Sequence, residues 1–155
     1  MNSKLLKVSA LALSALFLLS TGASAHNPPP NRNTVVTLTL DELDPALSAE
    51  VSGSSVPVVI EFYDPQDPDT TGECAQQVPA FQSTQQQFAG KITFVRANTR
   101  VQDQNMIARD RIAVCPTHLF VLERKGDTVY AKRIWGYLSE DQLKELFEEF
   151  YGVKP

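Results

Sequence analysis

Residues 56–88 read VPVVIEFYDPQDPDTTGECAQQVPAFQSTQQQF and carry the main structural pattern of the chain. The first eight are rich in β-branched and aromatic side chains, which is typical of a strand buried on both faces. One of them is nevertheless an acid, Glu61. A turn-rich segment follows. In residues 75–88 the apolar side chains have the spacing of one face of a helix, and Pro79 should kink that helix. The stretch therefore predicts a buried strand, a long loop and a helix.

The rest of the chain adds strand and helix patterns on both sides of this stretch. In chain order they predict a strand over 34–40, a helix over 41–50 interrupted near Pro45, a strand over 92–97, a helix over 103–112, strands over 117–123 and 129–134 joined by a turn at Gly126, and a helix that begins at Ser139. The order β-α-β-α-β-α-β-β-α predicts a single α/β domain. Its mixed central sheet should hold parallel strands followed by an antiparallel hairpin, with helices on both faces.

The last helix has the clearest start signal. Ser139 and Gln142 form a capping box, in which each side chain bonds the other residue's backbone N–H. Leu138 and Leu143 have the spacing of a hydrophobic staple. Apolar residues then recur at helical spacing, so one face of this helix should pack on the sheet.

Composition and the N-terminus indicate an exported, acidic protein. The chain has 155 residues, a formal charge of −4 and 43% hydrophobic residues, which suits one globular domain. Lys4 and Lys7, the apolar run 8–19 and the small residues 23–25 predict a cleaved secretory signal over residues 1–25. Cleavage leaves 12 basic against 18 acidic residues, a formal −6. This charge argues against binding to nucleic acid or anionic membranes.

The mature protein should be periplasmic or secreted, with no membrane anchor after cleavage. Residues 26–33, HNPPPNRN, have the composition of a flexible Pro-rich tether, and residues 34–155 should form the domain. Cys74 and Cys115 both remain after cleavage, in a compartment where a disulfide can form and persist.

The chain resembles the thioredoxin family over about residues 34–152. The marks that carry the resemblance occur in the family's order, and they are Glu61-Phe62-Tyr63 at the end of the central strand, Cys74 with Pro79 five residues later, Cys115-Pro116-Thr117 as the cis-proline motif, and Gly136 followed by Ser139 before the last helix. The resemblance implies a thioredoxin-like fold.

One departure from the family changes the expected chemistry. A thioredoxin carries Cys-x-x-Cys at the start of the first long helix, whereas this chain reads Thr71-Gly72-Glu73-Cys74, after a longer loop. The position of the attacking cysteine therefore holds Thr71. A hydroxyl cannot form the mixed disulfide that begins thiol exchange, so the family's ordinary mechanism cannot operate here.

In the family fold the segments that carry Cys74 and Cys115 face each other, so the resemblance implies a Cys74–Cys115 disulfide. Such a bond closes a loop of roughly 40 residues and typically contributes about 2–4 kcal/mol of stability. Two interpretations remain open: a rewired redox pair, or a structural cross-link. Glu61 aligns with the family's buried acid, which resembles a general base for the resolving cysteine, and the alternative is a partly buried carboxylate satisfied by hydrogen bonds. Desolvation should raise its pKa.

The segment around Pro116 is the expected recognition site. By resemblance its peptide bond is cis, and the adjacent backbone, with Thr117 and Thr71, would bind an extended peptide. The alternative is a trans proline in a plain turn. We expect no cofactor and no metal, because the acids of 64–73 lack calcium-loop spacing and His26 and His118 are distant in sequence. A third interpretation is metal handling by Cys74, Cys115 and His118.

The sequence thus predicts an exported thioredoxin-like protein that acts in thiol–disulfide exchange or redox-dependent recognition through Cys74 and Cys115 beside cis-Pro116. Its partner would be a protein or peptide that carries a thiol or a disulfide, and we expect a monomer. The alternative is a redox-inactive binding module, in which the disulfide is structural and the groove beside Pro116 holds a peptide.

Overall fold

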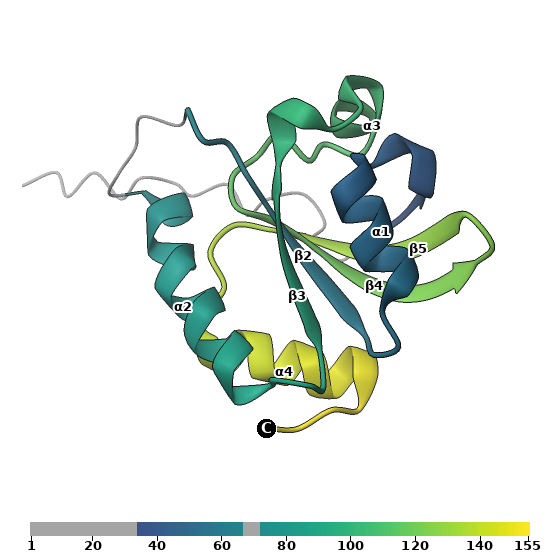
Figure 1. Ribbon diagram of the computed structural model, residues 1–155. Helices are drawn as coiled ribbons and strands as arrows, with labels where there is room; N and C mark the ends of the chain where they lie inside the picture. The colour runs from purple at the N-terminus through teal and green to yellow at the C-terminus, as the bar shows by residue number, and fades with distance from the viewer. Residues whose placement is uncertain (1–33, 67–71) are drawn as a thin grey trace, which may run out of the picture.

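The computed structural model describes residues 34–66 and 72–155, so the predictions for 1–25, 26–33 and Thr71 lie outside the described residues. The described residues form one α/β domain (Figure 1). Its elements are β1 (Thr34–Thr39), η1 (Leu40–Glu42), α1 (Pro45–Gly53), β2 (Val58–Tyr63), α2 (Glu73–Gln87), β3 (Thr93–Asn98), η2 (Thr99–Val101), α3 (Gln104–Arg109), β4 (Thr117–Lys125), β5 (Thr128–Trp135) and α4 (Glu140–Tyr151). Apart from the two short 3-10 turns, this is the predicted order of elements.

The strands form one mixed sheet in the order β1-β5-β4-β2-β3. β2 and β3 are parallel and are joined through α2, whereas β4 and β5 form the predicted antiparallel hairpin. β4 also pairs antiparallel with β2, and β1 pairs antiparallel with β5. The predicted α/β class with a mixed central sheet is confirmed.

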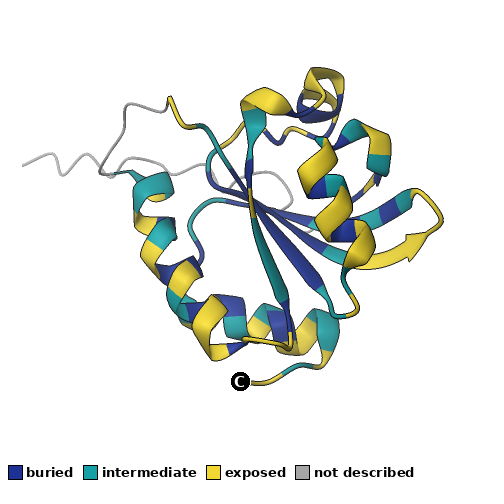
Figure 2. Ribbon diagram, viewed as in Figure 1, coloured by how far each residue is buried: buried dark blue, intermediate teal, exposed yellow. Residues whose placement is uncertain are grey.

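Helices cover both faces of the sheet (Figure 1). Side chains of α2 and α4 pack with Val59 and Phe120 on one face, and side chains of α1 and α3 pack with Ile60 and Leu119 on the other. In Figure 2 the central strands are largely buried while the outer sides of the helices are exposed. All of β2 except Tyr63 is buried, as predicted for a strand enclosed on both faces.

Two helix boundaries differ from the sequence prediction. Pro45 begins α1 instead of interrupting a helix, because the carboxylate of Asp44 caps it by accepting from the N–H groups of Ala46 (3.0 Å) and Leu47 (3.2 Å). A proline fits the first turn of a helix, where its missing N–H would have no partner. The helix predicted over 103–112 is also shorter and ends at Arg109.

The predicted start of the last helix is confirmed. Ser139 is the N-cap of α4, its hydroxyl accepts from the N–H of Gln142 at 3.3 Å, and its own N–H donates to the Gln142 side chain at 2.9 Å. Leu138 and Leu143 are 3% and 0% exposed and belong to the same core cluster. This end of α4 anchors the helix on the face that it shares with α2.

Candidate functional site

A disulfide joins Cys74 to Cys115 at one end of the sheet, as predicted. The two Cα atoms are 5.5 Å apart, and the residues are separated by 41 positions in sequence. Cys74 is the second residue of α2, and Cys115 lies in the segment that leads into β4. Both cysteines are partly exposed, so solvent has access to the pair.

The segment after Cys115 is held by several internal contacts. The peptide bond between Cys115 and Pro116 is cis, and the carbonyl of Pro116 accepts from the N–H of Gly136 at 2.9 Å. Thr117 is fully buried, and its hydroxyl donates to the carbonyl of Val114. The side chain of Thr117 is thus used inside the fold, and the substrate-binding role of Pro116 and Thr117 stays a prediction.

The first turns of α2 are tied to the loop between β5 and α4. The carboxylate of Glu73 accepts from the N–H of Tyr137 at 3.1 Å. The buried amide of Gln77 bonds both backbone groups of Leu138, accepting from its N–H at 2.7 Å and donating to its carbonyl at 3.0 Å. These contacts fix the helix that carries Cys74. The sequence prediction missed Gln77, because a glutamine in a helix gives no signal of its partner.

Glu61 belongs to β2, an inner strand of the sheet, and is 1% exposed. One of its oxygens, Oε1, accepts from Nε of Arg96 in the neighbouring strand β3 at 3.2 Å and from Nη2 at 3.0 Å. Burial raises the pKa of the Glu61 carboxyl, and the charge of Arg96 opposes that shift, so the direction predicted from the sequence is confirmed. The guanidinium of Arg96 also lies over the ring of Tyr63, 4.6 Å from its centroid.

His118 is the residue of β4 directly opposite Glu61 in β2. Its side chain is fully buried between aromatic rings, with centroids 6.2 Å from Phe81 and 6.5 Å from Phe120. Burial lowers the pKa of His118 to about 3, so the ring is neutral at physiological pH. Sequence reasoning placed His118 beside the cis-proline motif, but only the strand register placed it beside Glu61.

Across residues 34–66 and 72–155, no three His, Cys, Asp or Glu side chains gather closely enough to hold a metal ion. No helix within those same residues has the length and apolar character needed to cross a membrane.

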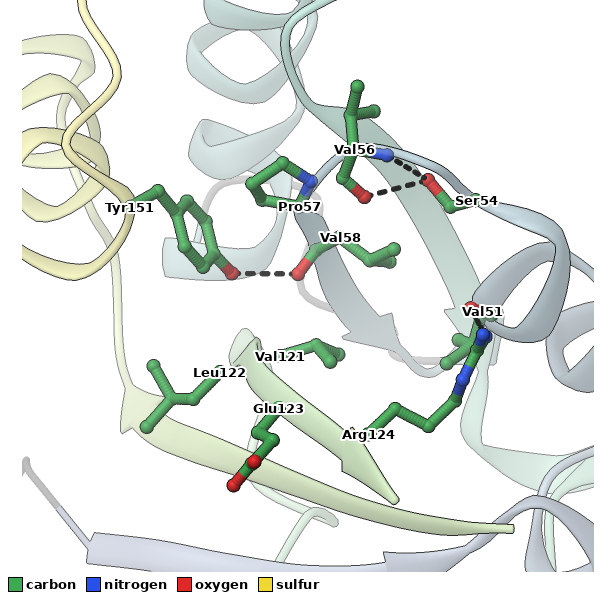
Figure 3. A pocket seen from close by; sticks show the side chains of 10 residues that line it. All are labelled: Val51, Ser54, Val56, Pro57, Val58, Val121, Leu122, Glu123, Arg124 and Tyr151. Atoms are coloured by element: carbon green, nitrogen blue, oxygen red, sulfur yellow. Dashed lines mark hydrogen bonds between the residues drawn. The ribbon is translucent and has the colours of Figure 1, made fainter. Parts of the chain in front are cut away.

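A pocket of about 310 Å³ lies beside the start of β2 (Figure 3). The disulfide lies toward the other end of that strand, where Phe62 pairs with Thr117. Its walls come from the end of α1, the start of β2, the outer half of β4 and the end of α4, and it is lined by Val51, Ser54, Val56, Pro57, Val58, Val121, Leu122, Glu123, Arg124 and Tyr151. The hydroxyl of Tyr151 donates to the carbonyl of Val58 at 2.8 Å. None of the predicted site residues lines this pocket.

Comparison with known proteins identifies the fold but no family. No family model matches the sequence, and no curated protein matches it. Among solved structures, the chain is similar to chloroplastic thioredoxin z, with 15% sequence identity, a TM-score of 0.57, and coverage of 72% of this chain and 92% of that chain. It also matches thioredoxin-2 of the malaria parasite at 16% identity, with a TM-score of 0.47 and coverage of 61% and 82% of the two chains. The likeness to thioredoxin z shows that the chain has a thioredoxin-like fold.

Proposed function

We propose that this chain is an exported thioredoxin-like protein that exchanges disulfides with a protein or peptide partner, or recognises it in a redox-dependent way, through Cys74 and Cys115 beside Pro116. The observation that carries the proposal is the position of the disulfide. It joins the first turn of α2 to the residue before Pro116, and both cysteines are partly exposed. A thioredoxin-like fold thus presents a sulfur–sulfur bond at one end of its sheet.

The two sulfurs differ in how well each accommodates a negative charge. Cys74 lies in the first turn of a 15-residue helix, where the helix dipole and free N–H groups favour a thiolate. Glu73 beside it acts in the opposite sense. A thiol with a lower pKa is the better leaving group in exchange. We therefore assign Cys115 as the attacked sulfur and Cys74 as the leaving one.

The exchange then proceeds in two balanced steps. A thiolate of the partner attacks Sγ of Cys115, the Sγ–Sγ bond breaks, and Cys74 leaves as a thiolate that takes up a proton. A second thiol of the partner loses its proton and attacks the mixed disulfide, which releases Cys115 as a thiol. The partner dithiol is oxidised to a disulfide, and the protein disulfide is reduced to two thiols.

Export is part of the proposal. It is supported by the basic start, apolar run and small residues of 1–25, and by a disulfide that would persist in an oxidising compartment. Mass spectrometry of the protein secreted or fractionated from its host should find a mature chain that begins at His26 and lacks a lipid. A chain that retains residues 1–25 in the cytoplasm would contradict this part.

A second candidate function is a redox-inactive binding module. It is favoured by the contacts that lock the disulfide end, in which Glu73 and Gln77 tie α2 to the loop after β5. In this version the Cys74–Cys115 bond is structural, and the protein recognises an extended peptide beside Pro116 without thiol chemistry.

The reduction potential of the Cys74–Cys115 pair separates the two functions. We would equilibrate the mature protein across a glutathione and dithiothreitol series and count alkylated cysteines by mass spectrometry. A midpoint between about −120 and −270 mV, the range of known oxidoreductases, supports exchange. A midpoint below about −300 mV supports the binding module. The variant Cys115→Ser, which leaves one thiol, is the alkylation standard for a chain that cannot form the bond.

A further inference from the structure

Two buried side chains at the end of β5 have N–H groups without acceptors. Arg133 and Trp135 are each 7% exposed. Among the described residues, Nε of Arg133 and Nε1 of Trp135 have no hydrogen-bond partner. A buried donor without an acceptor bears the whole cost of losing water, so two such donors in neighbouring side chains need an explanation.

The two side chains lie on one face of the sheet and contact each other. Alternate residues of a strand share a face, and Val129 and Ala131, which precede them in this series, belong to the core cluster packed against α1 and α3. The guanidinium carbon of Arg133 lies over the ring of Trp135, 4.2 Å from its centroid. The two unpaired donors therefore belong to one stacked pair of side chains.

The charge of Arg133 has no counter-ion in the part of the chain that the structure describes. Its Nη1 donates to the backbone carbonyl of Asp110, a group that carries no net charge. The carboxylate of Asp110 is bound instead by Arg109, through Oδ2 at 2.7 Å and Oδ1 at 3.2 Å. Buried charges are normally paired, because a lone one has lost its hydration without gaining a partner. Arg133 thus lacks both an acceptor and a negative charge.

A second arginine adds positive charge to this place. Burial lowers the pKa of Arg133, the charge of Asp110 opposes that shift, and the charge of Arg111 adds to it, so Arg111 acts on Arg133 through space. Arg111 is exposed and has a φ of 52°, a left-handed conformation that is uncommon for residues other than glycine. Residues held in such conformations gather at binding sites.

The charges at this place contrast with those of the whole chain. Both nearby carboxylates, those of Glu42 and Asp110, are bound by Arg109, which leaves Arg111 and Arg133 without acidic partners among the described residues. The chain as a whole has a formal charge of −4. A local excess of positive charge on an acidic protein attracts an anionic group.

A carboxylate has the chemistry that the stacked pair lacks. Each of its two oxygens can accept one N–H, so one carboxylate can satisfy Nε of Arg133 and Nε1 of Trp135 together. It also supplies the missing negative charge. A water molecule could accept the same hydrogen bonds but would leave the charge of Arg133 unpaired.

The stacked pair adjoins the segment that carries Cys115. Trp135 pairs with Thr117 in the strand register, and the N–H of Gly136 donates to the carbonyl of Pro116 at 2.9 Å. Cys115 is therefore two residues from the position opposite Trp135, and two residues of extended chain span about 7 Å. A residue next to the partner's reacting cysteine can cover such a distance.

We propose that Arg133 and Trp135, with the exposed Arg111 nearby, form a carboxylate-binding site, and that its ligand is an acidic side chain close to the reacting cysteine of the partner. The site stands on the unpaired donors and the lone charge, whereas the assignment of its ligand to the partner rests on the proposed function. The partner class is then a protein or peptide thiol with aspartate or glutamate beside its cysteine.

The first experiment tests the site without any redox step. The chain has one tryptophan, so the indole N–H of Trp135 gives a single ¹H–¹⁵N signal. We would titrate the oxidised mature protein with sodium acetate at an ionic strength held constant with sodium chloride. A carboxylate that accepts from Nε1 should move this signal downfield in a saturable way. An indole signal that does not move, or that moves equally with chloride alone, would overturn the site.

Three variants show which side chains hold the acetate. Arg133→Met keeps the aliphatic stem and should abolish the response. Because that change also removes the bond to Asp110 and can destabilise the fold, Arg111→Asn is the second variant, at an exposed position whose backbone asparagine tolerates. It should weaken acetate binding several-fold. Lys132→Met, which removes a cation from the opposite face of β5 beside Phe150, is the matched control and should bind acetate as the wild type does. An equal loss in Lys132→Met would reduce the effect to overall charge and overturn the site.

The second experiment tests the assignment to the partner. Two capped peptides would carry a single cysteine followed by glutamate or by glutamine, and we would compare their rates of attack on the Cys74–Cys115 bond at equal thiolate concentration. The glutamate peptide should react about tenfold faster, and in Arg133→Met and Arg111→Asn the ratio should fall toward unity. Since the chain is acidic overall, a protein without such a site should react more slowly with the glutamate peptide.

The outcomes distinguish this site from the proposed exchange. Saturable acetate binding with equal peptide rates would overturn the assignment to the partner and leave the carboxylate site standing. Acetate binding together with a reduction potential in the structural range would overturn the exchange and the assignment, and again leave the site standing. A reduction potential in the exchange range without any acetate response would overturn the site and leave the exchange standing.

Discussion

The two ends of strand β2 differ in whether the polar side chains beside them have hydrogen-bond partners. At its start, beside the 310 Å³ pocket, the hydroxyl of Tyr151 donates to the carbonyl of Val58 at 2.8 Å, and the hydroxyl of Ser54 bonds the backbone of Val56 (Figure 3). Toward its other end Glu61 and His118 keep buried atoms without partners.

The disulfide lies at the end with the unpaired buried atoms, and the pocket lies at the end where the half-buried hydroxyls of Ser54 and Tyr151 have partners. Satisfied polar groups stabilise a fold, whereas unpaired buried ones reduce stability and persist where they have another use. The proposed exchange therefore lies at the end of β2 with the unpaired groups and away from the pocket. Four predictions test this contrast between the two ends, in order of expected effect.

The largest effect should come from acidification acting on His118. The folded chain holds the pKa of His118 at about 3 through burial, whereas an unfolded chain has the ordinary value near 6.5. The unfolded state therefore binds the proton more tightly. The contribution of neutral His118 to the free energy of unfolding is fully present above about pH 6.5. It is lost as the pH drops toward 3, by up to about 5 kcal/mol. Urea unfolding across this range should show the loss in the wild type and a much flatter profile in His118→Leu. Equal slopes in the two proteins would contradict the buried neutral histidine.

Removing the disulfide should produce the next largest effect. The bond closes a loop of 41 positions, and a cross-link of that size restricts the unfolded chain by about 4 kcal/mol. The double variant Cys74→Ser/Cys115→Ser should lose about that much free energy of unfolding, measured by urea denaturation beside the oxidised wild type. Adding dithiothreitol to the wild type should reproduce the loss and leave the double variant unchanged. Equal stability of all three samples would show that the bond does not constrain the chain.

At the pocket end, Tyr151→Phe should have a smaller effect on stability and none on redox behaviour. The change removes the hydrogen bond to Val58 and leaves that carbonyl without its donor, at a cost of about 1 kcal/mol. Thermal or urea unfolding measures the cost, and the rate of disulfide reduction provides the contrast. A changed reduction rate would mean that the two ends of β2 are coupled.

The smallest effect is expected at Arg124, in the same pocket. Its guanidinium donates to the carbonyls of Val51 (2.8 Å) and Ser52 (2.5 Å) in the last turn of α1. Since the residue is exposed, Arg124→Met, which keeps the aliphatic stem, should cost about 0.5 kcal/mol in unfolding measurements. A loss of several kcal/mol would show that this contact holds α1 on the sheet.

The sequence predicted correctly those elements whose signals come from residues close together in the chain. The capping box of Ser139 and Gln142 and the turn at Gly126 involve residues at most a few positions apart, so their sequence patterns sufficed. The error at Pro45 came from treating a proline as a break in a helix, whereas Asp44 before it caps the helix and Pro45 begins it.

The pairing of Cys74 with Cys115 was predicted only through the resemblance to a known fold, because two cysteines 41 positions apart carry no local signal of contact. The neighbours of Glu61 lay beyond any such inference. Arg96 and His118 belong to two different strands, and their identities follow no local pattern around Glu61.

The sequence by itself thus determined the strands, the helices, the burial of Glu61 and the acidic character of the chain, since each depends on composition or on short-range periodicity. Only the tertiary structure decided which charged and titratable side chains meet. Strand register sets those contacts, and a shift by one residue would turn Glu61 or His118 to the other face of the sheet. The free energy that selects the register is the burial of the apolar side chains of both faces, so the packing of the core is what sets Glu61 opposite His118.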